Sequence, residues 1–237
     1  MIAQVLGIFH IESHEVVNKA IENFEKIYNA RARAKSFRRG EKKEALTAAF
    51  VICNTLAQCC IPRPPAYVAR YCGVEGEWRS ILNIAKVLRI DLREAETAGL
   101  TREDFELQDS APGDYIDTVC AHIGIPFNLA SRMTLVADAA KNMLYGRYPT
   151  VIAAAAMQLV LNEVGLLTRL SARDVCDQLT CQQKSVDRAI ARFKEMLVEE
   201  RKGCQDGKEK EDGNFGEAEE AAWRCVLHYG NGPVPAR

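Results

Sequence analysis

The stretch GRYPTVIAAAAMQLVLNEVGL, residues Gly146 to Leu166, decides the fold of this chain. Four consecutive alanines, Ala153 to Ala156, stand in its middle, and alanine is the strongest helix former. Large apolar residues flank them, so a helix predicted from Thr150 to Glu163 is apolar on nearly every face. Such a helix is surrounded by other elements. The stretch therefore predicts the central helix of a compact bundle, in which small side chains let neighbouring helices approach closely.

The 237 residues are 48% hydrophobic, enough for one large domain or for two of about 100 residues each. No apolar run is long enough to span a membrane, and no basic segment followed by an apolar one opens the chain. The sequence thus predicts neither a membrane span nor a signal peptide.

Nine cysteines are present. An odd number without a secretory signal favours free thiols in a reducing compartment. No pair has C-x-x-C spacing and the four histidines are scattered, so we expect no metal site and interpret the cysteines as small buried hydrophobic residues.

Helical periodicity dominates, and strand signals are almost absent. The sequence predicts an all-α protein of two tandem repeats, 1–92 and 111–200, joined by a charged linker, 93–110. A charged, partly disordered tail, 201–237, is expected to follow, with a short helix at Glu217 to Tyr229 that docks Trp223, Val226 and Leu227. Helices are predicted at 13–30, 42–58, 65–71, 75–88, 112–123, 126–143, 150–163, 171–179 and 182–200.

The alanine helix has an earlier counterpart. EALTAAFVICNTL repeats the small-residue pattern of TVIAAAAMQLVL, with Ala48 and Ala49 matching Ala155 and Ala156. The segments that follow each of them also align as a polar loop, a short helix, a turn and a longer helix. Duplication at this spacing predicts two similar helical domains.

The net charge is −1, but it is unevenly distributed. Seven basic residues lie between Arg31 and Lys43 against Glu41 alone. Such a run is able to neutralise phosphates; the alternative is an ordinary solvated loop between helices.

The segment SARDVCDQLTCQQKSVDRAIARFKEML, from Ser171 to Leu197, has a helix-turn-helix pattern. Its predicted inner face is Val175, Leu179, Val186, Ile190, Phe193 and Leu197. Polar residues lie at the start and on the outer face of the second helix, where a recognition helix reaches base edges or phosphates. The alternative is an ordinary amphipathic helix pair.

No nucleophile elbow, Walker loop, dinucleotide-binding glycine motif or H-E-x-x-H motif occurs. We therefore expect a binding protein without a catalytic site and without a cofactor.

The chain resembles the core domain of transcription factor IIB, which has two cyclin-like repeats of about five helices each, over about Ile11 to Arg201. GRYPTVIAAAAMQL is close to the second-repeat signature of that family at Gly146, Arg147, Pro149 and Ala153 to Ala156. DYIDTVCAHIGIP resembles the opening helix of that repeat, and IPRPP matches the first-repeat pattern only at Pro62 and Arg63. The low similarity makes the chain a divergent member.

The resemblance implies a nuclear initiation factor that binds the TATA-binding protein and promoter DNA and helps to assemble the RNA polymerase preinitiation complex. The family's zinc ribbon, which recruits the polymerase, corresponds to a segment not in this chain. The DNA-contacting residues expected from the basic run, the resemblance and the helix-turn-helix are Arg31, Arg33, Lys35, Arg38, Arg39, Lys42, Lys43, Arg63, Arg147, Gln182, Gln183, Lys184, Ser185, Arg188 and Arg192.

The sequence departs from the family in two places. Lys184 and Asp187 stand where a valine and an arginine read bases, so phosphate contact is expected rather than base reading. Glu75 and Gly76 stand where a lysine pair meets the TATA-binding protein.

Two other functions are compatible with the same fold. A cyclin would activate a kinase through a Lys/Glu pair in its first repeat, for which Lys42 or Lys43 is available. A cyclin-fold scaffold would use the fold for protein contacts alone.

Overall fold

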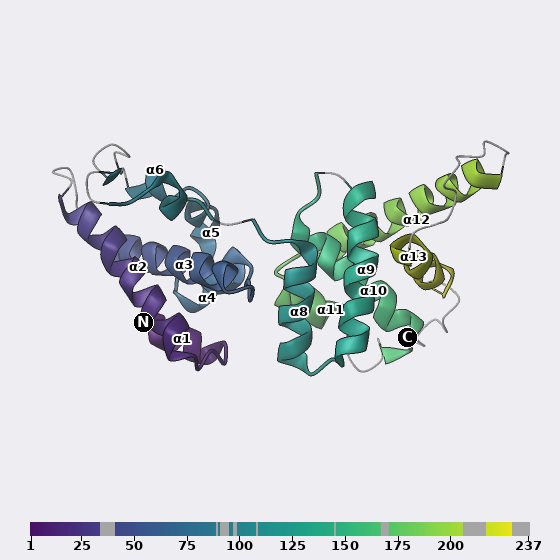
Figure 1. The fold of residues 1–237 in the computed structure, drawn as a ribbon, viewed down its shortest axis with the longest axis horizontal. Helices are drawn as coiled ribbons and strands as arrows, with labels where there is room; N and C mark the ends of the chain where they lie inside the picture. The colour runs from purple at the N-terminus through teal and green to yellow at the C-terminus, as the bar shows by residue number, and fades with distance from the viewer. Residues whose placement is uncertain are drawn as a thin grey trace. The chain divides into compact units, whose positions relative to one another are not determined.

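The computed structural model describes residues 1–33, 41–88, 90, 95–96, 99–107, 109–144, 146–166, 171–205 and 217–228. Over these ranges the regular structure is helical and no strand occurs, which confirms the predicted all-α class. The chain divides into two units, Met1–Ser110 and Ala111–Arg237. The helices of each unit are labelled in Figure 1.

The first unit is built around α3, Glu41–Gln58, which packs against α1, α2, α4, α5 and α6. Eleven consecutive residues of α3, from Leu46 to Leu56, are buried. The surrounding elements are α1 (Ile2–Ile8), α2 (His14–Arg33), α4 (Pro65–Tyr71), the 3-10 turn η1 (Glu75–Glu77), α5 (Trp78–Ile81), α6 (Ile84–Leu88) and the 3-10 turn η2 (Arg102–Phe105).

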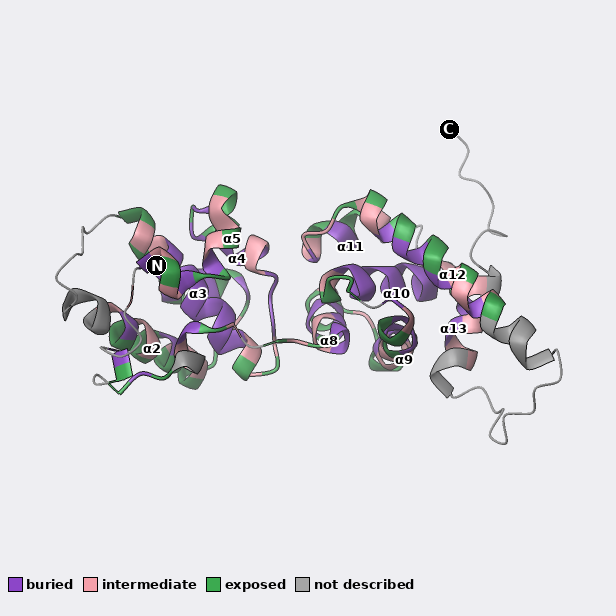
Figure 2. Cartoon of the chain, turned by 90° about the horizontal axis from the view of Figure 1, so that it is seen from above, coloured by how far each residue is buried: buried purple, intermediate pink, exposed green. Residues whose placement is uncertain are grey.

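The second unit is built in the same way around α10, Pro149–Glu163, which packs against α8, α9, α11, α12 and α13. Eleven consecutive residues, Val151 to Leu161, are buried, and the four alanines are at most 1% exposed. The prediction of a central alanine-rich helix is thus confirmed; Figure 2 shows α10 buried along its length. The other helices are α8 (Pro112–Ile123), α9 (Phe127–Met143), α11 (Ala172–Gln178), α12 (Gln183–Gln205) and α13 (Glu217–His228).

The last helix, α13, belongs to the core of the second unit. It packs against α9, α10 and α12. Ala222 and Cys225 are fully buried there, and Trp223 and Val226 are partly buried against the same core, as the sequence predicted. The side chain of Leu227 lies outside the described residues. The Cys225 thiol donates a 2.9 Å hydrogen bond to Glu163, the last residue of α10.

Two sequence predictions need correction. The helix expected over 75–88 is broken into η1, α5 and α6, because Asn83 begins a new helix by accepting the Val87 N–H through its carbonyl, and asparagine is favoured at such starts. The linker expected over 93–110 begins too early, because Ala95, Leu100 and Phe105 are buried in the core of the first unit.

Several helices end in a turn whose last residue has a left-handed backbone. Glycine usually takes this position because it has no Cβ. Here His10, Cys60 and Thr180 take it, with φ of 58°, 58° and 48°. In each case the next N–H closes the turn onto a carbonyl five residues back, and this hydrogen bond offsets the strain of a side chain in the left-handed region.

Candidate nucleic-acid interface

The helix-turn-helix begins at a capped N-terminus. The Ser171 hydroxyl accepts the Asp174 N–H at 3.1 Å, and the Asp174 carboxylate accepts the Ser171 N–H at 3.0 Å. The two residues thus form a capping box that fixes where α11 starts. The hydrogen bonds from Ser171 lower the pKa of Asp174, so this carboxylate stays ionised.

The turn between α11 and α12 is equally well defined. Cys181 N–H bonds to the Cys176 carbonyl at 3.0 Å, and Thr180 N–H bonds to the Asp177 carbonyl at 3.3 Å. These two bonds, with the left-handed Thr180, make a Schellman motif. The direction in which α12 leaves α11 is therefore set by backbone hydrogen bonds.

The faces of α12 are divided as the sequence predicted. The six residues predicted for the inner face of the helix-turn-helix are at most 2% exposed: Val175, Leu179, Val186, Ile190, Phe193 and Leu197. The opposite side carries Lys184, Asp187, Arg188, Ala191 and Arg192, all exposed. In Figure 2 this division appears as alternating buried and exposed turns along α12.

Three cations of the outer face follow each other at intervals of four residues, Lys184, Arg188 and Arg192. This spacing places them along one side of the helix, about one turn apart. Arg192 lies 3.3 Å from Glu195, an exposed pair that contributes little. Among the described residues, Lys184 and Arg188 form no ion pair. The row thus places solvated positive charge along one side of α12, where it is able to neutralise phosphates.

Gln183 points inward, although we expected it to contact DNA. Its amide exchanges two hydrogen bonds with buried Gln158 of α10, of 3.2 and 3.0 Å. It also donates to Asp187 at 2.7 Å. Gln183 therefore anchors the start of α12 to the central helix and is not available to a base edge in this conformation.

The neighbouring residues Gln182 and Ser185 complete the start of α12. Gln182 is exposed, and its carbonyl accepts the N–H groups of Ser185 and Val186 at 2.8 and 3.2 Å. Its side chain is available to a ligand, whereas Ser185 is half-buried.

Sequence reasoning missed Gln158, the centre of this arrangement. It is 1% exposed, in the middle of the most apolar helix. Besides Gln183 it bonds to the Ala172 carbonyl at 3.1 Å, so it holds both helices of the motif. A single glutamine inside MQLVLNE was the signal, because a buried amide has to be hydrogen-bonded.

Arg147 lies in the turn that precedes α10, and its side chain is exposed. Gly146 takes φ of 80°, and Pro149 is the first residue of the helix. These two residues explain the start of the GRYP stretch, because glycine adopts this backbone readily and proline suits a first helical position.

The basic run of the first unit is only partly described. Arg31 and Arg33 belong to the end of α2, with side chains outside the described part, and Lys35, Arg38 and Arg39 lie outside the described residues. Lys42 forms an ion pair with Glu77, and the Lys43 carbonyl accepts a hydrogen bond from Thr47. The described chain does not bring these cations together into one patch.

Arg63 is buried, which makes it an unsuitable contact for DNA. It is 6% exposed, and its guanidinium lies 5.7 Å from the ring centre of Phe9 and 5.9 Å from that of Tyr67. Its Nε has no hydrogen-bond partner among the residues that the structure describes. Burial lowers the pKa of this arginine, so its charge is held mainly by the aromatic faces.

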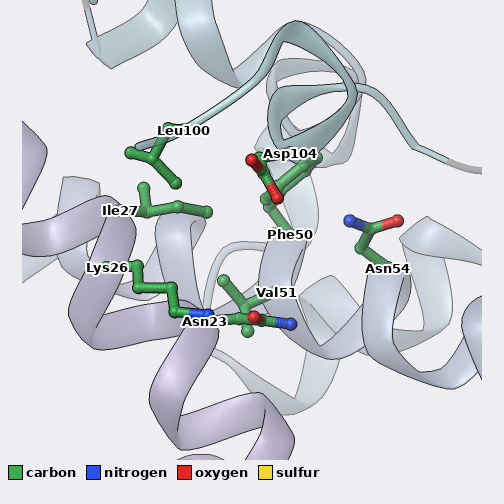
Figure 3. Close-up of a pocket in the computed structure, with 8 residues that line it drawn as sticks. All are labelled: Asn23, Lys26, Ile27, Phe50, Val51, Asn54, Leu100 and Asp104. Carbon is green, nitrogen blue, oxygen red and sulfur yellow. The ribbon is translucent and has the colours of Figure 1, made fainter. Parts of the chain in front are cut away.

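Two hollows were compared as binding sites. The one in the first unit, between α2, α3 and residues 100–104, has about 10 Å³, space for a single water molecule; Figure 3 shows its lining side chains. The other, of about 560 Å³, opens beside α11 and the start of α12 and includes Arg173, Cys176 and Gln183 in its lining.

Comparison with protein-family models gives no match, and comparison with curated proteins gives no significant match. Over the described residues no helix is both long and apolar enough to cross a membrane. No group of three or more histidine, cysteine or acidic residues in the described part is arranged to hold a metal ion.

Proposed function

We propose that this chain is a non-catalytic, nuclear DNA-binding factor of the transcription factor IIB type. In this proposal its two helical units are cyclin-like repeats that bind promoter DNA together with the TATA-binding protein. They help to assemble the RNA polymerase complex, and the polymerase is contacted through a segment not in this chain.

The observation that carries the proposal is the row Lys184, Arg188 and Arg192 on a helix whose position is fixed. The capping box, the Schellman turn and the Gln158–Gln183 pair each constrain α12. A preorganised row of cations loses little conformational freedom on binding a phosphate backbone. The similar construction of the two units, each with one small-residue helix enclosed by five others, supports the cyclin-like arrangement.

Asp187 shapes the kind of DNA binding that is proposed. Its carboxylate accepts a hydrogen bond from Gln183 and lies among the cations of α12. A carboxylate repels phosphate and cannot form the bidentate hydrogen bonds that arginine makes with guanine. The proposed interface therefore holds DNA chiefly through its backbone.

An electrophoretic mobility-shift assay tests the proposal. The full chain is mixed with promoter duplexes with and without the TATA-binding protein. We expect a complex with DNA alone at low salt and a tighter ternary complex when the second protein is added. The absence of both complexes would overturn the proposal.

A second candidate is a kinase-activating cyclin, and one observation favours it. Lys42 of α3 forms an ion pair with Glu77 of η1, which gives the first unit a solvent-accessible Lys/Glu pair. Co-precipitation of kinases with the wild-type chain, lost in Lys42→Glu, would support this function. Capture of the TATA-binding protein instead would favour the first proposal, and a scaffold would capture neither of them.

A further inference from the structure

Two cysteines occupy the positions of the Schellman turn whose side chains meet. In this motif the third residue before the helix cap and the second after it lie against each other, usually as an apolar pair. Here they are Cys176 and Cys181, and the 3.0 Å bond from Cys181 N–H to the Cys176 carbonyl fixes their separation. The two thiols are close enough to influence each other's pKa.

The surroundings make the two thiols unequal. The Cys176 sulfur lies 3.5 Å from the Gln158 amide nitrogen and 3.1 Å from the Gln183 amide oxygen. The neighbouring Cys181 thiol is the largest influence and lowers the pKa of Cys176; burial opposes this, and the Gln158 amide lowers the pKa further. The same interaction between the thiols raises the pKa of Cys181. Cys176 is therefore the thiol that loses its proton more readily, and Cys181 is the one that stays protonated.

Both cysteines are among the residues that line the open hollow of about 560 Å³ beside α11. Cys181 is half-buried, and Cys176, although largely covered, lines the same hollow. A small oxidant is thus able to approach the pair from solvent. By contrast, burial raises the pKa of Cys120 and Cys225 to about 12, so these thiols stay protonated.

We propose that Cys176 and Cys181 form a redox-active pair that hydrogen peroxide converts into a disulfide. The Cys176 thiolate attacks one peroxide oxygen and breaks the O–O bond, and the departing hydroxide takes a proton to become water. The sulfenic acid on Cys176 is then attacked by the Cys181 sulfur, which loses its proton. The S–S bond forms, the S–O bond breaks and a second water leaves. The two sulfurs are oxidised and the peroxide is reduced.

The disulfide would change the start of α12. Its sulfurs carry no hydrogen, so the hydrogen bond that Cys176 donates to Gln183 is lost. Gln183 directly precedes Lys184, the first cation of the row. This consequence rests on the proposed DNA-binding function, and we expect the oxidised chain to bind promoter duplex several-fold more weakly than the reduced chain.

Mass spectrometry of the full chain tests the pair without reference to DNA. The reduced protein is exposed to hydrogen peroxide, quenched, alkylated and digested with trypsin. Peptide 174–184 contains both cysteines. We expect it to become lighter by two hydrogen atoms and to take up no alkylating agent until a dithiol reductant restores both sites.

Cys59 and Cys60 provide the matched control, because they are adjacent at another helix end and Cys60 is more exposed than either proposed residue. They should keep their alkylation sites at doses that close the Cys176–Cys181 pair. In Cys181→Ser, whose fold is checked by circular dichroism, Cys176 should accumulate a sulfenic acid that a cyclic dione probe captures.

Two results would overturn the proposal: peptide 174–184 retaining both free thiols while Cys60 is oxidised, or a disulfide found only between chains. A disulfide that forms in a chain with no DNA binding in either state leaves the redox pair standing and removes the proposed function.

Discussion

The side-chain amides of Gln158 and Gln183 hydrogen-bond each other twice, although α10 and α12 bring them from positions 25 residues apart. Each amide acts once as donor and once as acceptor. This pair of hydrogen bonds lies inside an apolar interface. It links the central helix to the helix that carries the proposed DNA contacts.

Breaking this pair from one side should be costly. Gln158→Leu or Gln183→Leu should each lower the free energy of unfolding by about 1–3 kcal/mol, because the remaining amide loses its partner at a site that is buried for Gln158 and half-buried for Gln183. The double variant should lose less than the sum of the two. Urea denaturation of the three variants checks this, and strict additivity would contradict a direct coupling.

Enlarging any alanine of the quartet should destabilise the second unit. Ala153→Leu, Ala154→Leu, Ala155→Leu and Ala156→Leu should each cost about 1–3 kcal/mol, because all four side chains are at most 1% exposed and added methylenes overpack a buried interface. Ala191→Leu, on the exposed side of α12, is the control and should be nearly neutral. Thermal melts followed by circular dichroism measure both, and a quartet that tolerates leucine would contradict close helix packing around α10.

Arg63 should be replaceable by an apolar residue of similar length. Arg63→Met removes a buried cation whose Nε has no partner, and we expect the unfolding free energy to stay level or to rise by about 1 kcal/mol. Arg70→Met, at an exposed arginine, is the control. DNA affinity should be unchanged in Arg63→Met; a marked loss of affinity would show that Arg63 contacts DNA after all.

Stability should fall in alkaline solution because the thiols of the unfolded chain ionise at a lower pH than the buried thiols of the folded chain. Burial raises the folded-state pKa of Cys120 and of Cys225 from 9.0 to about 12. Each thiol therefore contributes fully below pH 9, and its contribution is lost as the pH rises from 9 towards 12. Denaturation between pH 8 and 11 should show a shallower decline in Cys225→Ala than in the wild type. Equal slopes would contradict this assignment.

Charge, rather than base sequence, should govern DNA binding. Lys184→Glu and Arg188→Glu should weaken binding to matched and scrambled duplexes alike, and each lost phosphate contact should reduce the slope of log K against log salt by about 1. The same loss is expected for Arg38→Glu with Arg39→Glu and for Arg147→Glu. Asp187→Arg should raise general affinity.

A salt titration of each variant on both duplexes provides the measurement for these charge changes. Strong discrimination between the duplexes combined with a shallow salt slope would instead show a base-reading helix.

Local patterns in the sequence were sufficient to predict most of the fold. The capped starts, the prolines at Pro65, Pro112 and Pro149 and the apolar periodicities are short-range signals, and the helices they predict occur within a few residues of the expected bounds. Helix α1 also had such a signal, since Ile2, Val5, Leu6 and Phe9 are spaced for one buried face, and it was missed because no N-terminal cap precedes it.

The chemistry of the site depends on long-range contacts, which short-range patterns do not report. Gln183 looks like a surface residue in its own helix and becomes an anchor only because Gln158 lies opposite. Arg63 follows a proline in an apparent loop, yet Phe9 from the other end of the unit covers it. The proximity of Cys176 and Cys181 follows from the left-handed backbone of Thr180. Such a turn is usually predicted from a glycine, and a threonine at this position does not indicate it.

The docking of α13 sets the order in which the two units fold during synthesis on the ribosome. Ala222 and Cys225 share one core with residues of α8 and α9, so the second unit cannot close this core until the chain has been translated past residue 225. The first unit contains its own core within residues 1–110 and is free to fold much earlier. We expect a nascent chain stalled before α13 to carry a protease-resistant first unit and a protease-sensitive second one.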